Sequence, residues 1–252
     1  MHLTCAEKDL NIIQSCLNED LLNISKWLIA NKLTFNMTKT EFMLIGSRQK
    51  VNAPTASPVL SINGTPVNQV SRSKSLGVLI DAILTWGSHI EKLAKKIASG
   101  IAAIKRVRQF VPPATLHLIY KALIQPHFDY CNVVWRSSGI KLADKLQKLQ
   151  NRASQELTFS SYDADASQLF QKLNWKNLST QRDIQKALMV SKSLNGLAPE
   201  YLSSKFIARS KTTSYTFRDS VDKLTIHSHA LIISVLVLAT VVLFSRIVFL
   251  KL

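Results

Sequence analysis

The chain has 252 residues, and its 32 lysine and arginine residues outnumber 16 acidic residues, which gives a net charge of +16. This length suits one large domain or two small ones, each able to bury a core. The excess positive charges repel one another in a compact fold, which favours a polyanionic partner. Nucleic acid is the first candidate for this partner and an anionic membrane surface is the second. A basic but merely solvated surface is the alternative. The three cysteines have no close or metal-type spacing, which argues against a disulfide framework and indicates a reducing compartment.

The first 81 residues are expected to form one helix followed by a small antiparallel sheet. Apolar residues recur at steps of three and four from Leu10 to Leu28, which predicts a helix with one apolar face. The segments "KLTFN" and "EFMLIG" are then expected to be extended around a polar turn. Asn63-Gly64 predicts a hairpin, because both residues tolerate positive φ. "KSLGVLI" is predicted to be a further strand, interrupted by Gly77.

Residues 88–205 are expected to be mainly helical. A capping box of Ser88 and Glu91 predicts the start of a long helix, and Pro112-Pro113 ends it and begins the next, "ATLHLIYKALIQ". Pro126 kinks or ends that second helix. Leucines and an alanine at helical spacing predict a third helix over 142–157. "TQRDIQKALMVSKSLNG" predicts a fourth, ended by its glycine.

The predicted long helix is strongly basic. Six cations against the single acid Glu91 lie between residues 89 and 108: Lys92, Lys95, Lys96, Lys105, Arg106 and Arg108. Such cations bind a phosphate backbone with release of counterions and without reading base sequence. We favour nucleic acid over the alternative of a solvated helix face, because the whole chain shares the basic bias.

No Gly-rich phosphate loop, zinc-ligand cluster or nucleophile elbow is present in the sequence. His127 and Cys131 lie four residues apart, but two ligands do not make a metal site, and core packing is the preferred interpretation. Asp163 and Asp165 are interpreted as acids at a helix start, because no strand context holds them for metal binding. The four tryptophans sit among apolar neighbours and are expected in cores: Trp27, Trp86, Trp135 and Trp175.

Several consecutive segments resemble one known family. They are "WLIANKLTFNMTKTEFMLIGS", "LSINGTPVNQVSRSKSLGVLID", "WGSHIEKLAKKIASGIAAIKRV" and "LIYKALIQPHFDYCNVVW". In this order they resemble the reverse transcriptase of jockey-like non-LTR (LINE-type) retrotransposons, over residues 2–226. The resemblance implies part of a polymerase palm at 1–81, thumb-like helices at 82–139 and a helical connector at 140–205. A polar linker at 206–229 and an apolar tail at 230–252 follow.

The resemblance also implies roles for particular residues. Asn36, Lys39, Thr40 and Glu41 match the motif that closes the palm near the incoming nucleotide. "KSLGVLID" is similar to the primer-grip region, and the basic helix would follow the template–primer duplex as part of the thumb.

One departure from the family pattern is decisive for activity. The family's paired active-site aspartates belong to an "ADD" motif just before a segment like "MHLTCAEKDL", and this sequence starts at that segment. The family's Mg²⁺ chemistry needs those carboxylates. We therefore expect no cofactor and no polymerase activity here. Weak, sequence-independent binding of an RNA or DNA template–primer duplex would remain.

The apolar tail from Ala230 to Leu252 admits two interpretations. Its 23 residues come close to the roughly 20 that span a bilayer as a helix. The alternative function is therefore a membrane-tethered, non-enzymatic basic protein, placed at a membrane by this helix instead of in the cytoplasm or nucleus as the family implies. Codons can also be chosen so that a neighbouring frame of "HSHALIIS" reads "PQPRTNYL", which relatives carry at this point. A frameshifted soluble C-terminus is thus the second interpretation.

Taken together, the sequence predicts an α+β fold. A helix and a small antiparallel sheet would form a partial palm, a helical thumb and connector would follow, and an apolar helix would end the chain.

Overall fold

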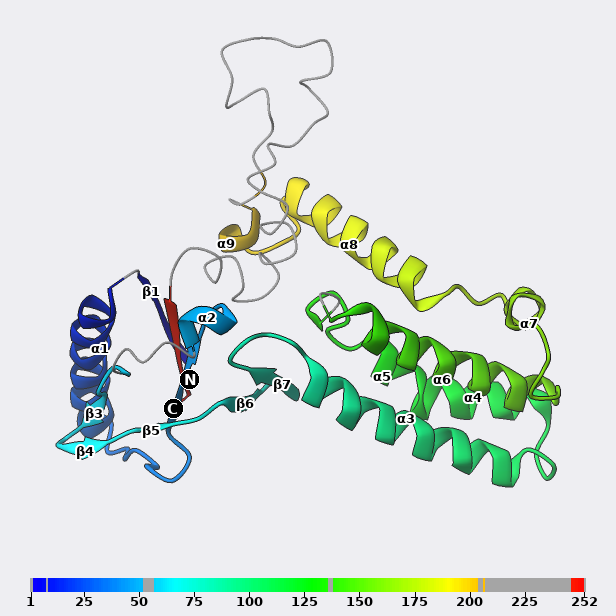
Figure 1. The fold of residues 1–252 in the computed structure, drawn as a ribbon, viewed down its shortest axis with the longest axis horizontal. Coiled ribbons are helices and arrows are strands. Elements are labelled where there is room, and N and C mark those ends of the chain that lie inside the picture. Colours follow the sequence, from blue (N-terminus) through cyan, green and yellow to red (C-terminus); the bar gives the residue numbers. More distant parts are fainter. Residues whose placement is uncertain are drawn as a thin grey trace, which may run out of the picture. The chain divides into compact units, whose positions relative to one another are not determined.

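The computed structural model describes residues 2–7, 9–51, 57–135, 138–203, 206 and 246–251 (Figure 1). It divides into two compact units. Unit 1 comprises Met1–Thr85 together with Ala230–Leu252, and unit 2 comprises Trp86–His229. Unit 1 contains all the described strands and unit 2 is helical, so the α+β class is confirmed.

Unit 1 begins with strand β1 (His2–Glu7), which leads into helix α1 (Leu10–Ala30). The Asp9 side chain caps this helix by accepting a hydrogen bond of 2.9 Å from the backbone N–H of Asn11. The apolar face predicted from the sequence is confirmed, since Ile13, Leu17 and Leu21 are buried.

The main sheet of unit 1 has four strands in the order β1–β8–β2–β5. Strand β8 (Arg246–Lys251) runs antiparallel to both β1 and β2 (Glu41–Ile45), whereas β5 (Asn68–Gln69) runs parallel to β2. The expected sheet is therefore present but mixed in direction. It lies against α1, and the shared core joins α1 to β2 and to the segment from Leu60 to Val67.

Two hairpins complete unit 1. Strands β3 (Ser61–Ile62) and β4 (Thr65–Pro66) meet at Asn63-Gly64, whose φ values of 50° and 80° confirm the predicted turn. The single strand predicted at "KSLGVLI" is wrong. That stretch holds a turn at Leu76-Gly77 (φ 45° and 85°), which joins β6 (Arg72–Ser75) to β7 (Val78–Asp81).

Two smaller differences concern the first part of unit 1. The predicted extended segment "KLTFN" forms no strand, because its end belongs to a hydrogen-bonded turn before β2. The predicted loop after β2 contains a short helix, α2 (Arg48–Val51).

Unit 2 contains the four helices predicted from periodicity and three short ones. The described helices are α3 (Gly87–Val107), α4 (Pro113–Leu123), α5 (Gln125–Asp129), α6 (Ile140–Thr158), α7 (Ala166–Leu173), α8 (Leu178–Leu194) and α9 (Glu200–Ser203). Helices α3 and α6 pack side by side along much of their lengths, as Figure 1 shows. This pair positions the candidate site.

The capping box predicted at the start of the long helix is wrong. Helix α3 begins at Gly87, so Ser88 and Glu91 lie inside its first turns, and the N-cap is Trp86 in a left-handed conformation (φ 64°). The Trp86 side chain is buried, and its carbonyl accepts the hydrogen bond from the Ile90 N–H. Burial of the indole therefore fixes the helix start without a side-chain cap.

The prediction for the tryptophans holds at two positions and fails at one. Trp86 and Trp135 are fully buried, whereas Trp27 is 58% exposed on α1. Trp175 is half-buried and stacks on Tyr120, with ring centroids 4.3 Å apart.

The predicted apolar C-terminal helix requires a correction. Residues 246–251 form strand β8, because their backbone completes the hydrogen bonding between β1 and β2. Residues 207–245 and 252, which include most of the predicted linker and tail, lie outside the described residues. In the part of the chain that is described, no helix is both long and apolar enough to cross a bilayer.

Candidate nucleic-acid interface

Helix α3 is amphipathic, and five of the six predicted cations are exposed on it. Its buried side carries the isoleucines from Ile90 to Ile104. At about 100° per residue, four exposed cations fall within an arc of about 100° on the other side. They are Lys92, Lys95, Lys96 and Arg106. Lys105 is also exposed but lies outside that arc.

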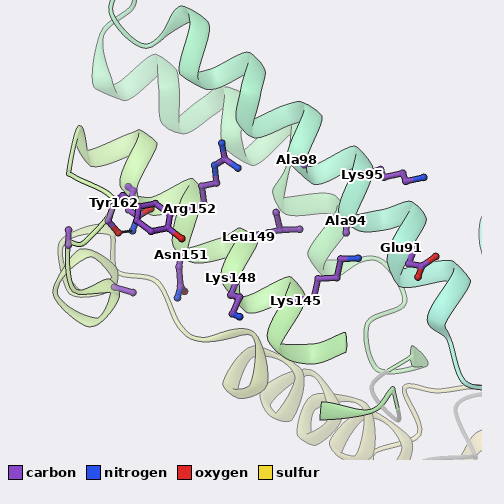
Figure 2. Close-up of a pocket in the computed structure, with 13 residues that line it drawn as sticks. Glu91, Ala94, Lys95, Ala98, Lys145, Lys148, Leu149, Asn151, Arg152 and Tyr162 are labelled. Carbon is purple, nitrogen blue, oxygen red and sulfur yellow. Dashed lines mark hydrogen bonds between the residues drawn. The ribbon is translucent and has the colours of Figure 1, made fainter. Parts of the chain in front are cut away.

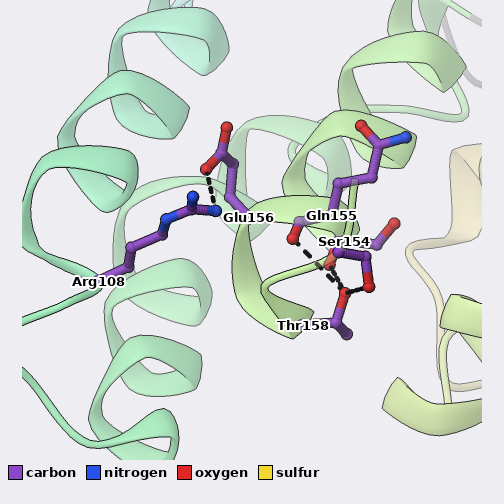
Figure 3. A network of polar contacts seen from close by, with 6 residues as sticks. Arg108, Ser154, Gln155, Glu156 and Thr158 are labelled. Carbon is purple, nitrogen blue, oxygen red and sulfur yellow. Dashed lines mark hydrogen bonds and ion pairs between the residues drawn. The ribbon is translucent and has the colours of Figure 1, made fainter. Parts of the chain in front are cut away.

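The sixth cation, Arg108, is engaged inside unit 2. Its guanidinium donates a hydrogen bond of 2.7 Å to the Glu156 carboxylate of α6 (Figure 3). It also lies 5.3 Å from the centre of the Phe159 ring. Arg108 therefore ties the end of α3 to α6, and the structure does not bring it together with the exposed lysines.

A second row of basic residues, which the sequence analysis did not predict, lies on α6. Lys141, Lys145, Lys148 and Arg152 are all exposed, at successive steps of four, three and four residues. The apolar residues that predict this helix recur at the same steps. Helical spacing in the sequence is therefore a signal from which this basic row can be predicted. The cations share one face because i, i+4 and i+7 positions align on a helix.

The two basic helices border a groove of about 860 Å³. Its charged lining consists of four cations (Lys95, Lys145, Lys148 and Arg152) and one acid, Glu91. Figure 2 shows Ala94, Ala98 and Leu149 between the two helices, with the side chain of Lys145 extending toward α3. The groove thus has an apolar floor and a basic rim, which suits a ligand with an anionic backbone.

The segment after α6 closes one end of the groove. Gln155 on α6 donates a hydrogen bond of 2.8 Å to the backbone carbonyl of Tyr162, whose own side chain is exposed. Asp165 caps α7 by accepting 3.0 Å from the Ser167 N–H, which confirms the predicted helix-start role for this acid. Asp163 is exposed in the preceding turn.

The two histidines next to the cations of α3 have lowered pKa values. Burial, and then the charge of Lys92, hold the pKa of His89 below its ordinary value. Burial and then Lys96 lower the pKa of His127. Both are therefore neutral at pH 7 and add no charge to the basic surface.

His127 and Cys131 do not share a helix. Helix α5 ends at Asp129, and Cys131 lies in a turn with φ 51°. Within the described ranges, no group of three or more His, Cys, Asp or Glu side chains is arranged to hold a metal ion.

In unit 1 the structure brings Asn36, Lys39 and Thr40 into one turn before β2. The Asn36 carbonyl accepts hydrogen bonds from the N–H groups of Lys39 and Thr40, both at 3.0 Å, and from the Thr40 hydroxyl at 2.9 Å. The Asn36 side chain accepts from Thr38 at 2.6 Å. Thr40 is buried, so this turn sets where β2 begins, while Lys39 remains exposed.

Comparison with known proteins bears on the origin of these elements. The chain is 25% identical over 135 residues to a probable RNA-directed DNA polymerase from transposon BS of Drosophila melanogaster. It is 22% identical over 137 residues to a probable RNA-directed DNA polymerase from transposon X-element of the same organism. The matches cover 52% and 53% of this chain. The matched half is a reverse transcriptase-like region.

This reverse transcriptase-like region spans only 15% and 14% of the two polymerases. No family model and no solved structure matches the chain. The structure divides the chain at Thr85–Trp86, close to the expected palm–thumb border after residue 81. The assignment of its parts to palm, thumb and connector stays a prediction.

Proposed function

We propose that these residues are a piece of a retrotransposon-derived RNA-directed DNA polymerase that binds nucleic-acid duplex without extending primers. The groove between α3 and α6 carries the proposal, because its charged lining is four cations against one acid. The similarity to two transposon polymerases supports nucleic acid over other polyanions. An RNA or DNA template–primer duplex is the proposed partner.

The chemistry of the groove predicts how the duplex would be bound. Exposed lysines on two packed helices contact phosphates and release counterions, so affinity falls with rising salt. The lining consists mainly of cations and small apolar side chains, and its two amides are engaged within unit 2, where Asn151 accepts a hydrogen bond from Gln147 and Gln155 donates one to the Tyr162 carbonyl. Such a surface positions a backbone but does not read bases, so binding would be weak and independent of sequence.

The catalytic part of the proposal rests on the sequence. The "ADD" motif that supplies the family's paired metal-binding aspartates is not among these 252 residues. Two-metal phosphoryl transfer without these ligands loses the activation of the primer hydroxyl and the stabilisation of transition-state charge. These residues by themselves would therefore not extend a primer, and no Mg²⁺ cofactor is proposed for them.

Salt-dependent binding of a short RNA–DNA duplex tests the proposal. Fluorescence anisotropy would give the slope of log affinity against log salt for the intact chain. Replacing Lys145, Lys148 and Arg152 together by alanine removes three cations from the groove and should reduce the magnitude of that slope by about three units. A scrambled duplex of equal length should bind equally well.

A matched control removes the same charge elsewhere in unit 2. Lys121, Lys172 and Lys192 are exposed and do not line the groove. Their joint replacement by alanine should leave most of the slope intact. Equal losses in the two triple variants would contradict a defined interface. No duplex binding at low salt, together with binding to anionic vesicles, would favour the alternative of a membrane-bound basic protein.

A further inference from the structure

The main sheet of unit 1 contains a slot that is one strand wide. Strands β1 and β2 both run antiparallel to β8, so they are parallel to each other, and α1 connects them. Neighbouring strands lie about 4.8 Å apart, so β1 and β2 are separated by roughly twice that distance. A β–α–β connection of this kind leaves room for one antiparallel strand between its two strands.

Strand β8 fills this slot along its whole length. All six of its residues are in register with β1, and five are also in register with β2. Val248 is opposite Cys5 on one side and Leu44 on the other. Leu44 belongs to the core cluster of α1, and Cys5 packs against that cluster. The slot thus crosses the core of unit 1, and its vacancy would leave the facing N–H and C=O groups of both strands without partners.

No short turn connects the occupant to the slot. Before β8, the last residue that the structure describes is Phe206. Residues 207–245 lie between Phe206 and the start of β8. A connection of this length can extend to roughly 130 Å. The strand is therefore held in place by its ladder hydrogen bonds and not by a hairpin.

We propose that the slot between β1 and β2 is a strand-acceptor site for the segment Arg246–Lys251, and that a second copy of the chain can donate this segment. Recognition would follow strand addition, in which main-chain hydrogen bonds on both edges give affinity and register. The exchanged product is a dimer in which each copy completes the other's sheet. Because the connection is long, the same six pairs form whether the strand comes from its own chain or from another.

A proline substitution in β8 tests the acceptor site in the full chain. Each residue of a central strand donates its N–H to one of two neighbours, so Val248→Pro breaks the ladder and empties the slot. A fluorescent peptide of residues 245–252 should then bind the variant at least about tenfold more tightly than it binds the wild-type chain, whose slot is filled. Val248→Ile keeps the N–H and should behave as the wild type.

Two controls decide the peptide result. The same peptide carrying proline at position 248 should not bind the Val248→Pro chain. Equal binding of the two peptides, or equal binding of the normal peptide to all three chains, overturns the acceptor site. Hydrogen exchange on the wild-type chain covers the case in which the proline variant fails to fold. The amides of Cys5 in β1 and Met43 in β2 face β8 in the pairing register and should be protected, and fast exchange at both overturns the proposal.

Donation by a second copy is tested by mixing two defective chains. The Val248→Pro chain offers a slot but no strand. A Met43→Pro chain offers a strand, but its slot lacks the Met43 N–H that faces β8. Native mass spectrometry should detect a heterodimer only in the mixture. A mixture that stays monomeric while the peptide binds overturns donation between copies.

Discussion

Replacing Arg108 by methionine removes the guanidinium that pairs with Glu156 but keeps an unbranched apolar stem of similar length. The ion pair joins the end of α3 to α6 at 2.7 Å, and the two side chains are 30% and 10% exposed, respectively. The substitution therefore leaves a nearly buried carboxylate without its charged partner. It also removes the cation from beside the Phe159 ring.

The expected loss lies between the limits for exposed and buried pairs. An exposed ion pair contributes about 0–1 kcal/mol. Breaking a fully buried pair costs about 3–5 kcal/mol. Because Glu156 is nearly buried while water reaches Arg108, we expect Arg108→Met to lower the free energy of unfolding of unit 2 by about 2 kcal/mol. A loss of that size corresponds to a fall in melting temperature of roughly 5–10 °C for a unit of this size.

Denaturant and thermal unfolding followed by circular dichroism measure this loss. The double variant Arg108→Met/Glu156→Leu should recover about half of it or more, because neither charge is then left buried alone. Duplex binding supplies a second readout. Arg108→Met should leave the salt slope unchanged, whereas Lys95→Met should reduce its magnitude by about one unit without loss of stability.

Two results would refute this reasoning. One is an Arg108→Met chain whose stability lies within about 0.5 kcal/mol of the wild type, the usual range for a surface substitution. The other is an equal loss of salt slope in the Arg108 and Lys95 variants, which would return Arg108 to the duplex-binding surface.

Three further predictions concern packing, pH and catalysis. A Cβ at Gly100 would lie 2.8 Å from Cγ1 of the buried Ile124. Gly100→Ala should therefore destabilise unit 2 by about 1 kcal/mol despite its better helix propensity, and a chain that gains stability in urea would contradict the close packing. The pKa of His89 is lowered by burial, so the unfolded state binds the proton first and stability should fall as the pH drops below about 6.5. A pH series of urea midpoints should be flatter for His89→Gln. Purified chain should extend no primer on an RNA template with Mg²⁺ or Mn²⁺, and extension above a no-protein control would disprove the proposed inactivity.

Local patterns account for the elements that the sequence predicted correctly. The period of apolar residues located α1, α3 and α6, because each helix buries one face. Asn63-Gly64 located a hairpin, because its backbone conformation depends on those two residues. The basic row of α6 follows the same local rule, because its four cations recur at steps of four, three and four residues.

Long-range contacts account for what the sequence could not predict. Arg108 resembles its neighbouring cations in sequence, and only the fold brings Glu156, 48 positions away, within 2.7 Å. Trp86 replaces the predicted Ser88 cap because its indole is buried, which a local motif does not report. The apolar tail resembled a membrane helix by composition, and the strand at 246–251 is specified by partners at the opposite end of the chain.

The register of β1 with β8 also sets an order of assembly during synthesis. Cys5 pairs with Val248, and all of unit 2 lies between these two residues in the sequence. The sheet of unit 1 can therefore be completed only after unit 2 has been synthesised. On the ribosome the helices of unit 2 are complete before β8 is translated, and they can pack through contacts that are mostly between neighbouring segments. The residues of β1 are thus made before unit 2 but reach their native pairing after it, and until then β1 and β2 expose unpaired edges that other chains or chaperones can bind.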